Sequence, residues 1–417
     1  MATAEQSSKS ALALRWRETF AALRHYNYRL WFIGQVVSLV GTWMQSTAQG
    51  YLIYQITGSP AYLGLVGFVG GAPSLIFTLF GGVIADRLPR RKMLVITQTS
   101  MMILAFILAA LTFMGLVLPW HIIVLAFLLG VANAFDAPAR TSFILELVSR
   151  EDMTNAIALN STMFNIGTVV GPAIAGLTYA AFGPAWCFTI NGISFIAVIV
   201  ALLLMRIKLE PQAPRQTRAL AELGEGIRYV LANRLILSLI ISVGIVSVFG
   251  IGMMNLLPAW AKDVLNGDVT TNGWLVSARG FGSLVSALML AYWGTRKARG
   301  KLWTIGAFVM PVMLVVFALT RWLPLSLIFL VAIGWSFMMV TNNSHAIVQS
   351  LVPDELRGRV MGVYTLVFFG SMPIGALLAG ELAQRIGETV TVILSGLVMM
   401  VLAIVAWKRL PDIRTQE

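Results

Sequence analysis

Long apolar tracts without charge dominate the chain. Residues 30–85 and 153–205 form runs of 56 and 53 residues that contain no Asp, Glu, Lys or Arg. Because a membrane-crossing helix needs about 20 predominantly apolar residues, each tract has room for two spans and a turn. The pattern predicts an all-α, polytopic membrane protein.

Turn sequences divide the apolar tracts into spans. Gly58-Ser59-Pro60 cuts the first tract, and Phe182-Gly183-Pro184 cuts the second. Twelve helices follow, six on each side of a polar stretch. The predicted spans are 30–54, 61–85, 93–117, 121–140, 154–181, 186–205, 235–261, 273–293, 302–320, 325–346, 360–385 and 389–407.

The Lys and Arg positions give the orientation. With the N-terminus in the cytoplasm, 26 of the 30 basic residues fall in the two chain ends and the connections on that side. The opposite side holds Lys262, Arg321 and Arg385, and Arg279 falls within a span. Basic residues in short loops stay cytoplasmic, so we expect a multi-pass protein of the cytoplasmic (inner) membrane with both termini inside. The same bias accounts for the net charge of +12 without a nucleic-acid partner.

The two halves of the chain resemble each other. A shift of 204 residues aligns 146–183 with 350–387 without a gap and matches Gly171 with Gly375, Gly176 with Gly380 and Gly183 with Gly387. Parallel repeats are typical of transporters that bind substrate between their halves. The expected organisation is a cytoplasmic segment (1–29), a six-helix bundle (30–205), a cytoplasmic linker (206–234), a second bundle (235–407) and a cytoplasmic tail (408–417).

The connection between the second and third spans is strongly charged. Residues 82–92 read GVIADRLPRRK, with one acid and four cations. Such a cluster could latch neighbouring helix ends by charge-assisted hydrogen bonds, or it could be a positive-inside loop and nothing more. Its order resembles the signature loop of the major facilitator superfamily, with Pro89 where glycine is usual. The resemblance implies gating roles for Asp86, Arg87, Arg90 and Arg91. The counterpart at 294–301 lacks the acid.

The fifth span carries small residues at helical spacing, namely Gly167, Gly171 and Gly176, together with Pro172. Small residues four apart allow helix backbones to approach closely, and any membrane bundle could use them for packing. The segment resembles the antiporter signature of proton-driven exporters in the superfamily. That resemblance implies a tight seam with the eighth helix.

The stretch from Asn27 to Pro60 carries the most specific resemblance. It includes Asn27-Tyr28-Arg29-Leu30-Trp31 and Leu52-Ile53-Tyr54-Gln55-Ile56-Thr57. It is similar to the exporter branch that includes enterobactin and macrolide efflux proteins, the transmembrane secretion effectors. The resemblance implies two rocking six-helix halves and proton-coupled export.

Two polar stripes are candidates for binding substrate. The first, on one face of helix 1, consists of Gln35, Ser38, Thr42, Gln45 and Gln49. These residues are spaced by 3, 4, 3 and 4 positions and therefore share an arc of about 80°. Because amides facing lipid are costly, the stripe must face the bundle interior, where it forms helix–helix hydrogen bonds or lines a wet cavity; its full-depth extent favours the cavity. The second, on helix 10, consists of Trp335, Met338, Asn342 and His345, with core packing as the alternative for its first two members. Asn255 on helix 7 is a weaker candidate.

Few charges fall within the spans. Arg279 would cost about 2.5–3.5 kcal/mol at mid-membrane, so it requires a partner or water; Glu381 is a candidate partner, a proton site or a carboxylate at the headgroups. His345 could titrate near neutral pH or pack as a neutral side chain. Asp136 and Arg140 lie one turn apart, which suggests an intrahelical pair. Alternatively, Asp136 holds the basic loop in a gating relay.

We therefore expect a proton-coupled exporter of small amphipathic or hydrophobic molecules such as a drug, macrolide or siderophore. The alternative is an importer or a lipid or lysolipid flippase on the same fold. A receptor or scaffold is disfavoured because no sizeable extramembrane domain is present. An enzyme is disfavoured because no paired acids, nucleophile–base set or metal cluster appears, and the single Cys187 excludes an internal disulfide. The expected partners are a small-molecule substrate, protons and membrane lipid; no cofactor or metal is expected, and the protein is expected to be a monomer.

Overall fold

The computed structural model describes residues 20–85, 89–206, 219–293, 299–409, 411 and 413, and nearly all of them are helical. The predicted gating residues Asp86 and Arg87 lie outside the described residues. A short 3₁₀ turn, Ala21–Arg24, precedes the long helices. The helices of the first half are α2 (Tyr26–Thr57), α3 (Pro60–Ala85), α4 (Arg90–Phe113), α5 (Pro119–Ile144), α6 (Met153–Phe182) and α7 (Pro184–Leu204). Those of the second half are α8 (Ala219–Ala232), α9 (Arg234–Ile245), α10 (Leu257–Ala259), α11 (Val269–Trp293), α12 (Arg299–Leu319), α13 (Leu323–Leu351), α14 (Asp354–Ile386) and α15 (Glu388–Arg409).

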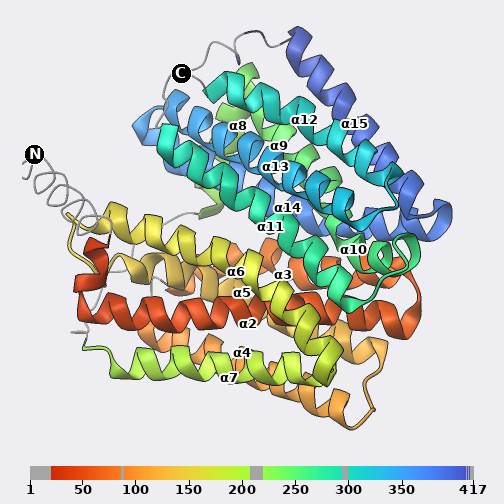
Figure 1. Ribbon diagram of the computed structural model, residues 1–417. Helices are drawn as coiled ribbons and strands as arrows, with labels where there is room; N and C mark the ends of the chain where they lie inside the picture. The colour runs from red at the N-terminus through yellow and green to blue at the C-terminus, as the bar shows by residue number, and fades with distance from the viewer. Residues whose placement is uncertain are drawn as a thin grey trace, which may run out of the picture.

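These helices form two bundles, α2–α7 and α9–α15, which Figure 1 shows one above the other. Within the first bundle α2 packs against α6 and α7, and α3 against α5; within the second, α13 packs against α11 and α12. The bundles meet along two seams, α3 against α14 and α6 against α11. Since α6 and α14 are the segments aligned by the internal repeat, the two seams are equivalent. The predicted fold class, a duplicated bundle of membrane-spanning helices, is confirmed.

Eleven segments of the described chain are long and apolar enough to cross a membrane. They match eleven of the twelve predicted spans. The remaining span, α2, is 32 residues long and runs beside the others in the first bundle (Figure 1). Its buried face carries Gln35, Gln45 and Gln49, which explains why it is less apolar than its neighbours.

Glycine turns join consecutive spans at one end of the bundle. Gly58, Gly183 and Gly387 have φ of 60°, 89° and 83°, a region that only glycine occupies without strain. Gly183 and Gly387 are the paired positions of the repeat, so both halves make the same turn. We call this the outer end; the inner end is where α2 begins and α15 ends.

The seventh span departs from the predicted single helix over 235–261. After α9 the chain forms a π-helical stretch (Val246–Ile251), a 3₁₀ turn (Gly252–Leu256), the short α10 and a second π-helical stretch (Trp260–Val264). Two features account for the irregularity. Pro258 has no N–H to donate, and a Cβ at Gly252 would lie 2.4 Å from the carbonyl carbon of Gly375, so the backbone of this span rests directly on α14.

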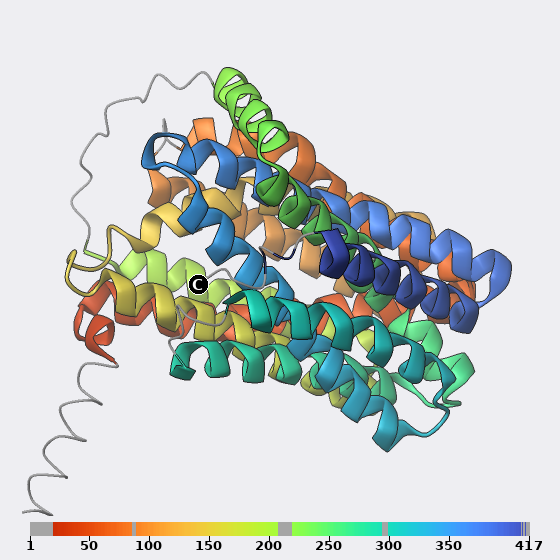
Figure 2. The ribbon, with the colours of Figure 1, turned by 90° about the horizontal axis from the view of Figure 1, so that it is seen from above.

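The predicted polar linker contains a helix that the sequence analysis did not foresee. In this segment, α8 leads into α9 and lies against α14 at the inner end (Figure 2). A Cβ at Gly226 would lie 2.6 Å from the carbonyl oxygen of Arg359, and the Arg359 guanidinium pairs with Glu225. The second half of the linker is therefore fixed to the second bundle.

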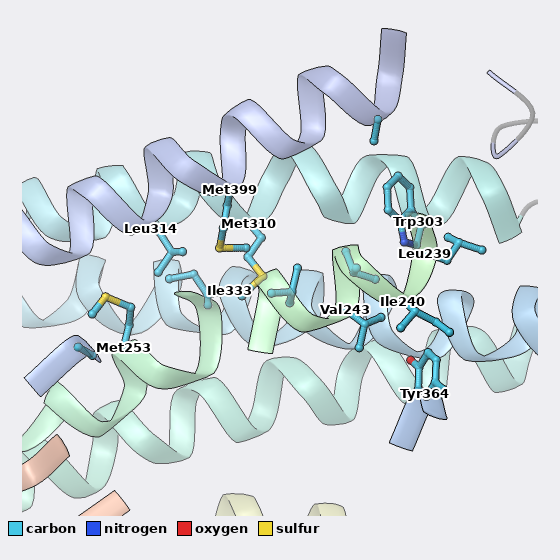
Figure 3. Packing of buried hydrophobic residues seen from close by; sticks show 14 of the residues in the cluster. Leu239, Ile240, Val243, Met253, Trp303, Met310, Leu314, Ile333, Tyr364 and Met399 are labelled. Carbon is cyan, nitrogen blue, oxygen red and sulfur yellow. The ribbon is translucent and has the colours of Figure 1, made fainter. Parts of the chain in front are cut away.

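Each bundle has its own apolar core. In the second bundle, Met253, Met310, Leu314 and Met399 interdigitate between α12, α15 and the broken span, as Figure 3 shows. In the first bundle, Trp31 is fully buried and packs edge-on against Phe143 with ring centroids 5.4 Å apart. A smaller cluster at the outer end joins the first bundle to Ala259 and Val269 of the second. The main cores are separate, which allows each half to move as a unit.

Candidate functional site: the cavity between the halves

Glycines bring the two bundles into backbone contact toward the outer end. On the α6–α11 seam, a Cβ at Gly273 would lie 2.6 Å from the carbonyl oxygen of Pro172. On the α3–α14 seam, a Cβ at Gly64 would lie 2.5 Å from the carbonyl oxygen of Ala376, and one at Gly380 would lie 2.6 Å from that of Pro60. Contacts this close leave no space for a side chain.

Side-chain hydrogen bonds reinforce the outer closure. The Tyr54 hydroxyl of α2 donates to the Asp263 carboxylate at the end of the broken span, and Lys262 lies 5.8 Å from the centre of the Tyr54 ring. At the other seam the Ser59 hydroxyl donates to Gln384 Oε1 over 2.6 Å. The bundles splay apart toward the inner end (Figure 1). We call this state, closed at the outer end and open at the inner end, inward-facing.

The glycines of the predicted antiporter-type motif pack against two helices, α11 and α2. Gly176 meets α11, where a Cβ would lie 3.0 Å from Thr270 Cα, as expected. Gly167 and Gly171 instead face α2, where Cβ atoms would meet Trp43 at 3.0 and 2.6 Å. The expected seam with the eighth helix is thus made at Gly176, whereas Gly167 and Gly171 pack within the first bundle. The reason is angular: Gly171 and Gly176 are five positions apart and so point about 140° away from each other.

A cavity of about 870 Å³ lies between the halves. Its walls come from all six helices of the first bundle, α2 to α7, and from the broken span, α11, α13 and α14 of the second. Ligand pockets for small molecules typically measure about 300–1,000 Å³, so the volume suits one drug-sized molecule. The cavity lies between the halves, where the internal repeat predicts the substrate site.

The residues of the α2 stripe have two different surroundings: some line the cavity, and others pack inside the first bundle. Thr42, Gln45 and Gln49 line the cavity, and Gln45 Oε1 also accepts a hydrogen bond of 2.7 Å from Asn191 Nδ2. Gln35 and Ser38 are not among the cavity-lining residues, contrary to prediction. They are 1% and 3% exposed, because the inner part of α2 packs inside its own bundle.

Three of the four residues of the α13 stripe lie at the cavity. Met338, Asn342 and His345 line the cavity, as does Asn255 of the broken span. Trp335 does not; its Nε1 donates to Met289 Sδ of α11 over 3.2 Å. For Trp335 the alternative of helix packing therefore holds.

Arg279 and Glu381 do not meet. Arg279 lines the cavity, whereas Glu381 lies near the outer end of α14 and faces Arg385, one turn away, at 3.8 Å. The Glu381 side chain is 49% exposed, which matches the alternative of a carboxylate at the membrane surface. The predicted pairing of these two residues is wrong in this state.

Asp136 is the centre of a buried polar network inside the first bundle. Its carboxylate is 1% exposed and accepts hydrogen bonds from Thr97 Oγ1 (2.7 Å), Gln98 Nε2 (2.9 Å) and Arg140 Nε (3.0 Å). Arg140 also donates to Gln35 Oε1 over 3.0 Å. The intrahelical pair is thus present, and it ties α2, α4 and α5 together.

The basic residues at the start of α4 have partners at the inner end. Arg90 donates to the Glu146 carboxylate of the α5–α6 connection, and Arg91 Nη2 donates to the Leu203 carbonyl oxygen over 2.9 Å. Both therefore fasten α4 to neighbouring inner ends. The proposed relay from this loop to Asp136 stays a prediction.

Comparisons with known proteins agree with this architecture. A family profile described as transmembrane secretion effector matches residues 17–417. The chain belongs to this family. Transmembrane secretion effectors are transporters of the major facilitator type rather than enzymes, and their relatives include efflux proteins.

Three proteins of known name are similar to this chain over most of its length. The multidrug efflux pump Tap of Mycolicibacterium fortuitum is 28% identical over 368 residues, 85% of this chain and 89% of Tap. Macrolide efflux protein A of Streptococcus pyogenes is 25% identical and covers 91% of this chain and 94% of its own. The enterobactin exporter EntS of Escherichia coli is 25% identical, with coverages of 94% and 93%.

Solved structures show the same fold. The nucleoside transporter NupG superposes with a TM-score of 0.75 at 14% identity and covers 92% of this chain and 98% of its own. A bacterial homologue of the human lysosomal transporter Spinster, in an inward-facing and occupied conformation, gives 0.73 at 13% identity, with coverages of 94% and 98%. At these identities the likeness concerns the fold alone.

Sequence reasoning missed several residues of the site. Asn272, Tyr364 and Phe368 line the cavity, and the Tyr54–Asp263 hydrogen bond closes its outer end. Asn272, Val276, Arg279 and Ser283 fall on one helical face, so a search for a stripe around Arg279 would have found them. Tyr54 and Asp263 are 209 positions apart and carry no common pattern.

Proposed function

We propose that this chain is a proton-coupled secondary active exporter of small amphipathic or hydrophobic molecules across the cytoplasmic membrane. The observation that carries the proposal is the cavity between the halves, which combines amides, hydroxyls and aromatic rings from both bundles. A site built from both halves loses its shape when the halves rock, and this change is what releases cargo to the other side. The printed functions of the relatives, multidrug, macrolide and enterobactin efflux, support export of a drug, macrolide or siderophore.

The structure supports a specific route for the rocking motion. The seams that close the outer end consist of backbone contacts at Gly64, Gly273 and Gly380 and a few hydrogen bonds. These contacts separate without dismantling the main core of either bundle; only the cluster at the outer end, which includes Ala259 and Val269 of the second bundle, is shared. Closing the inner end then exposes the cavity outside.

Proton coupling is proposed at His345. Among the described residues that line the cavity, the ionisable side chains are Arg279, His345 and Tyr364, and an imidazole is the one whose ordinary pKa falls between pH 5 and 8. Its ring meets that of Tyr364 edge-on at 5.4 Å. A proton gradient is a sufficient source, since one charge crossing about 100 mV supplies about 2.3 kcal/mol.

Transport in everted vesicles tests the proposal. With an imposed gradient, acidic inside, we expect vesicles containing the protein to take up radiolabelled enterobactin and to lose this uptake when a protonophore is added. Vesicles without the protein are the control. Uptake by whole cells, with none in everted vesicles, would instead establish import. Uptake that is insensitive to the protonophore would remove the coupling.

A further inference from the structure

Arg279 gives the cavity a positive charge that the protein does not neutralise. Arg279 lines the cavity and forms no salt bridge with the described residues. Glu381, the acid that the sequence suggested as its partner, lies beside Arg385 instead. The described lining residues include no Asp or Glu. Asp136, the buried acid of the first bundle, is already held by Arg140, Thr97 and Gln98.

A cation in this position is costly unless something compensates for it. An Arg side chain stays charged at any physiological pH, and a charge near mid-membrane requires water or a counter-ion. Water fills this role while the cavity is open. When the halves close around cargo, fewer water molecules remain in the cavity, and an anionic group of the cargo can compensate for the charge of Arg279.

Asn272 supplies a second, neutral polar point on the same wall. It is 1% exposed, and both its Oδ1 and its Nδ2 lack hydrogen-bond partners among the described residues. An unsatisfied buried amide is unusual, because it costs about 1–3 kcal/mol. Asn272 also lines the cavity, so a ligand atom there would satisfy it.

The helix fixes the spacing of the two polar points. Asn272 and Arg279 are seven residues, two turns, apart on α11, which places their Cα atoms about 10 Å apart along the axis. Asn272 is nearer the outer end. An extended small molecule would therefore place its acidic group at Arg279 and a hydrogen-bonding group toward Asn272.

Aromatic rings form another part of the cavity wall. Phe368 of α14 lies between Phe337 and Tyr364, with ring centroids 6.2 and 6.5 Å away, and all three line the cavity. Stacked rings bind a flat apolar or aromatic body. The site thus combines one cation, one free amide and an apolar platform.

We infer that the cavity selects amphipathic monoanions, with a carboxylate or sulfonate held by Arg279 and an aromatic body on the Phe337–Tyr364–Phe368 platform. This inference rests on the proposed function, because it names the cargo class of the same cavity. A planar guanidinium binds a carboxylate through two parallel hydrogen bonds. A cationic molecule of the same shape would place a second positive charge beside Arg279 and is rejected on that ground.

Binding of three dansyl probes to the purified protein in nanodiscs tests the charge preference. Dansylglycine, dansylamide and dansylcadaverine share one fluorophore and carry charges of −1, 0 and +1 at neutral pH. We expect dansylglycine to bind about tenfold or more tightly than dansylamide, which is the size of a charge-assisted hydrogen bond, and dansylcadaverine to bind most weakly.

Variants at Arg279 assign the preference to this side chain. Arg279→Gln should abolish the advantage of dansylglycine and leave the dansylamide affinity within about twofold. Arg279→Lys should retain part of the advantage, and Arg409→Gln, an exposed position at the inner end of α15, should change nothing. Chromatographic monodispersity and thermal melting confirm that each variant is folded.

Three results would overturn the inference. They are equal affinity for the three probes, preference for dansylcadaverine, and an Arg279→Gln variant that keeps the preference for dansylglycine. The assay measures binding at equilibrium and needs no gradient. A protein that binds dansylglycine through Arg279 but fails to export in everted vesicles would refute the proposed function and retain the anion site.

Discussion

Replacing Gly273 with leucine should abolish transport while leaving the protein folded. In the inward-facing state a Cβ at this position would lie 2.6 Å from the carbonyl oxygen of Pro172 and 3.1 Å from Gly176 Cα, and backbone atoms cannot move aside as a flexible side chain does. Relief requires α6 and α11 to part, which opens the outer end. A penalty of about 3 kcal/mol disfavours the inward-facing state roughly a hundredfold.

Uptake into everted vesicles and the yield of monodisperse protein measure the two parts of this prediction. Gly224→Leu is the matched control, since that glycine of α8 is exposed and a Cβ there would meet nothing within 4 Å. Full transport by Gly273→Leu would show that the α6–α11 seam does not have to close in the cycle. Gly273→Ala should give an intermediate loss.

Glycine contacts inside a bundle should behave differently from those between bundles. A Cβ at Gly334 of α13 would lie 2.0 Å from the carbonyl oxygen of Arg279 on α11, and these helices belong to the same bundle. Rocking of the halves cannot relieve that clash. Gly334→Leu therefore serves as a contrasting variant that loses folded protein rather than transport alone.

Asp136→Asn should be among the most destabilising conservative substitutions in the first bundle. It keeps the shape of the side chain but removes the counter-charge of Arg140, whose side chain is 22% exposed. Breaking one side of a buried ion pair costs about 3–5 kcal/mol, and we expect roughly 2–3 kcal/mol here, because partial exposure of Arg140 reduces the penalty. Thermal melting in detergent, read by size-exclusion chromatography, measures the loss.

Two variants accompany this measurement. Asp354→Asn removes the acid of an exposed pair with Arg357, in which Asp354 is 80% exposed, and should leave melting unchanged. Arg140→Gln combined with Asp136→Asn should recover part of the loss, because no unpaired charge remains. Equal melting of wild-type protein and Asp136→Asn would contradict a structural role for the pair.

The sequence predicts the fold because the bilayer imposes strong rules on it. Apolar tracts must become helices that satisfy their own backbone groups. The turn glycines Gly58, Gly183 and Gly387 mark the ends of spans, and all three adopt positive φ. The break in the seventh span could not be predicted from the sequence. It depends on a contact with the backbone of α14 at Gly375, which is 123 positions from Gly252 in the chain.

The site is less predictable because it is formed by contacts between distant segments. The polar stripe of α2 shows that Gln35 and Gln45 face inward, but a helical period cannot distinguish the interior of one bundle from the cavity between two. Gln35 belongs to the Arg140 network, and Gln45 lines the cavity. Likewise Trp335 shares a face with Met338, and only the position of Met289 shows that it packs on α11.

The central claim is that two rigid halves alternate around the cavity, closed at one end whenever they are open at the other. Distances between spin labels, measured by double electron–electron resonance, test it directly. One pair, Ser149→Cys with Ser350→Cys, spans the inner end; a second, Leu116→Cys with Leu319→Cys, spans the outer end, and all four positions are exposed. Both pairs are introduced with Cys187→Ser, which removes the native thiol.

Introducing Gly273→Leu into each labelled pair should lengthen the outer distance and shorten the inner one relative to the unsubstituted seam. Changes of opposite sign at the two ends are what rocking about the cavity requires. Distances that change in the same direction at both ends, or that do not change at either, would contradict alternating access by these two halves.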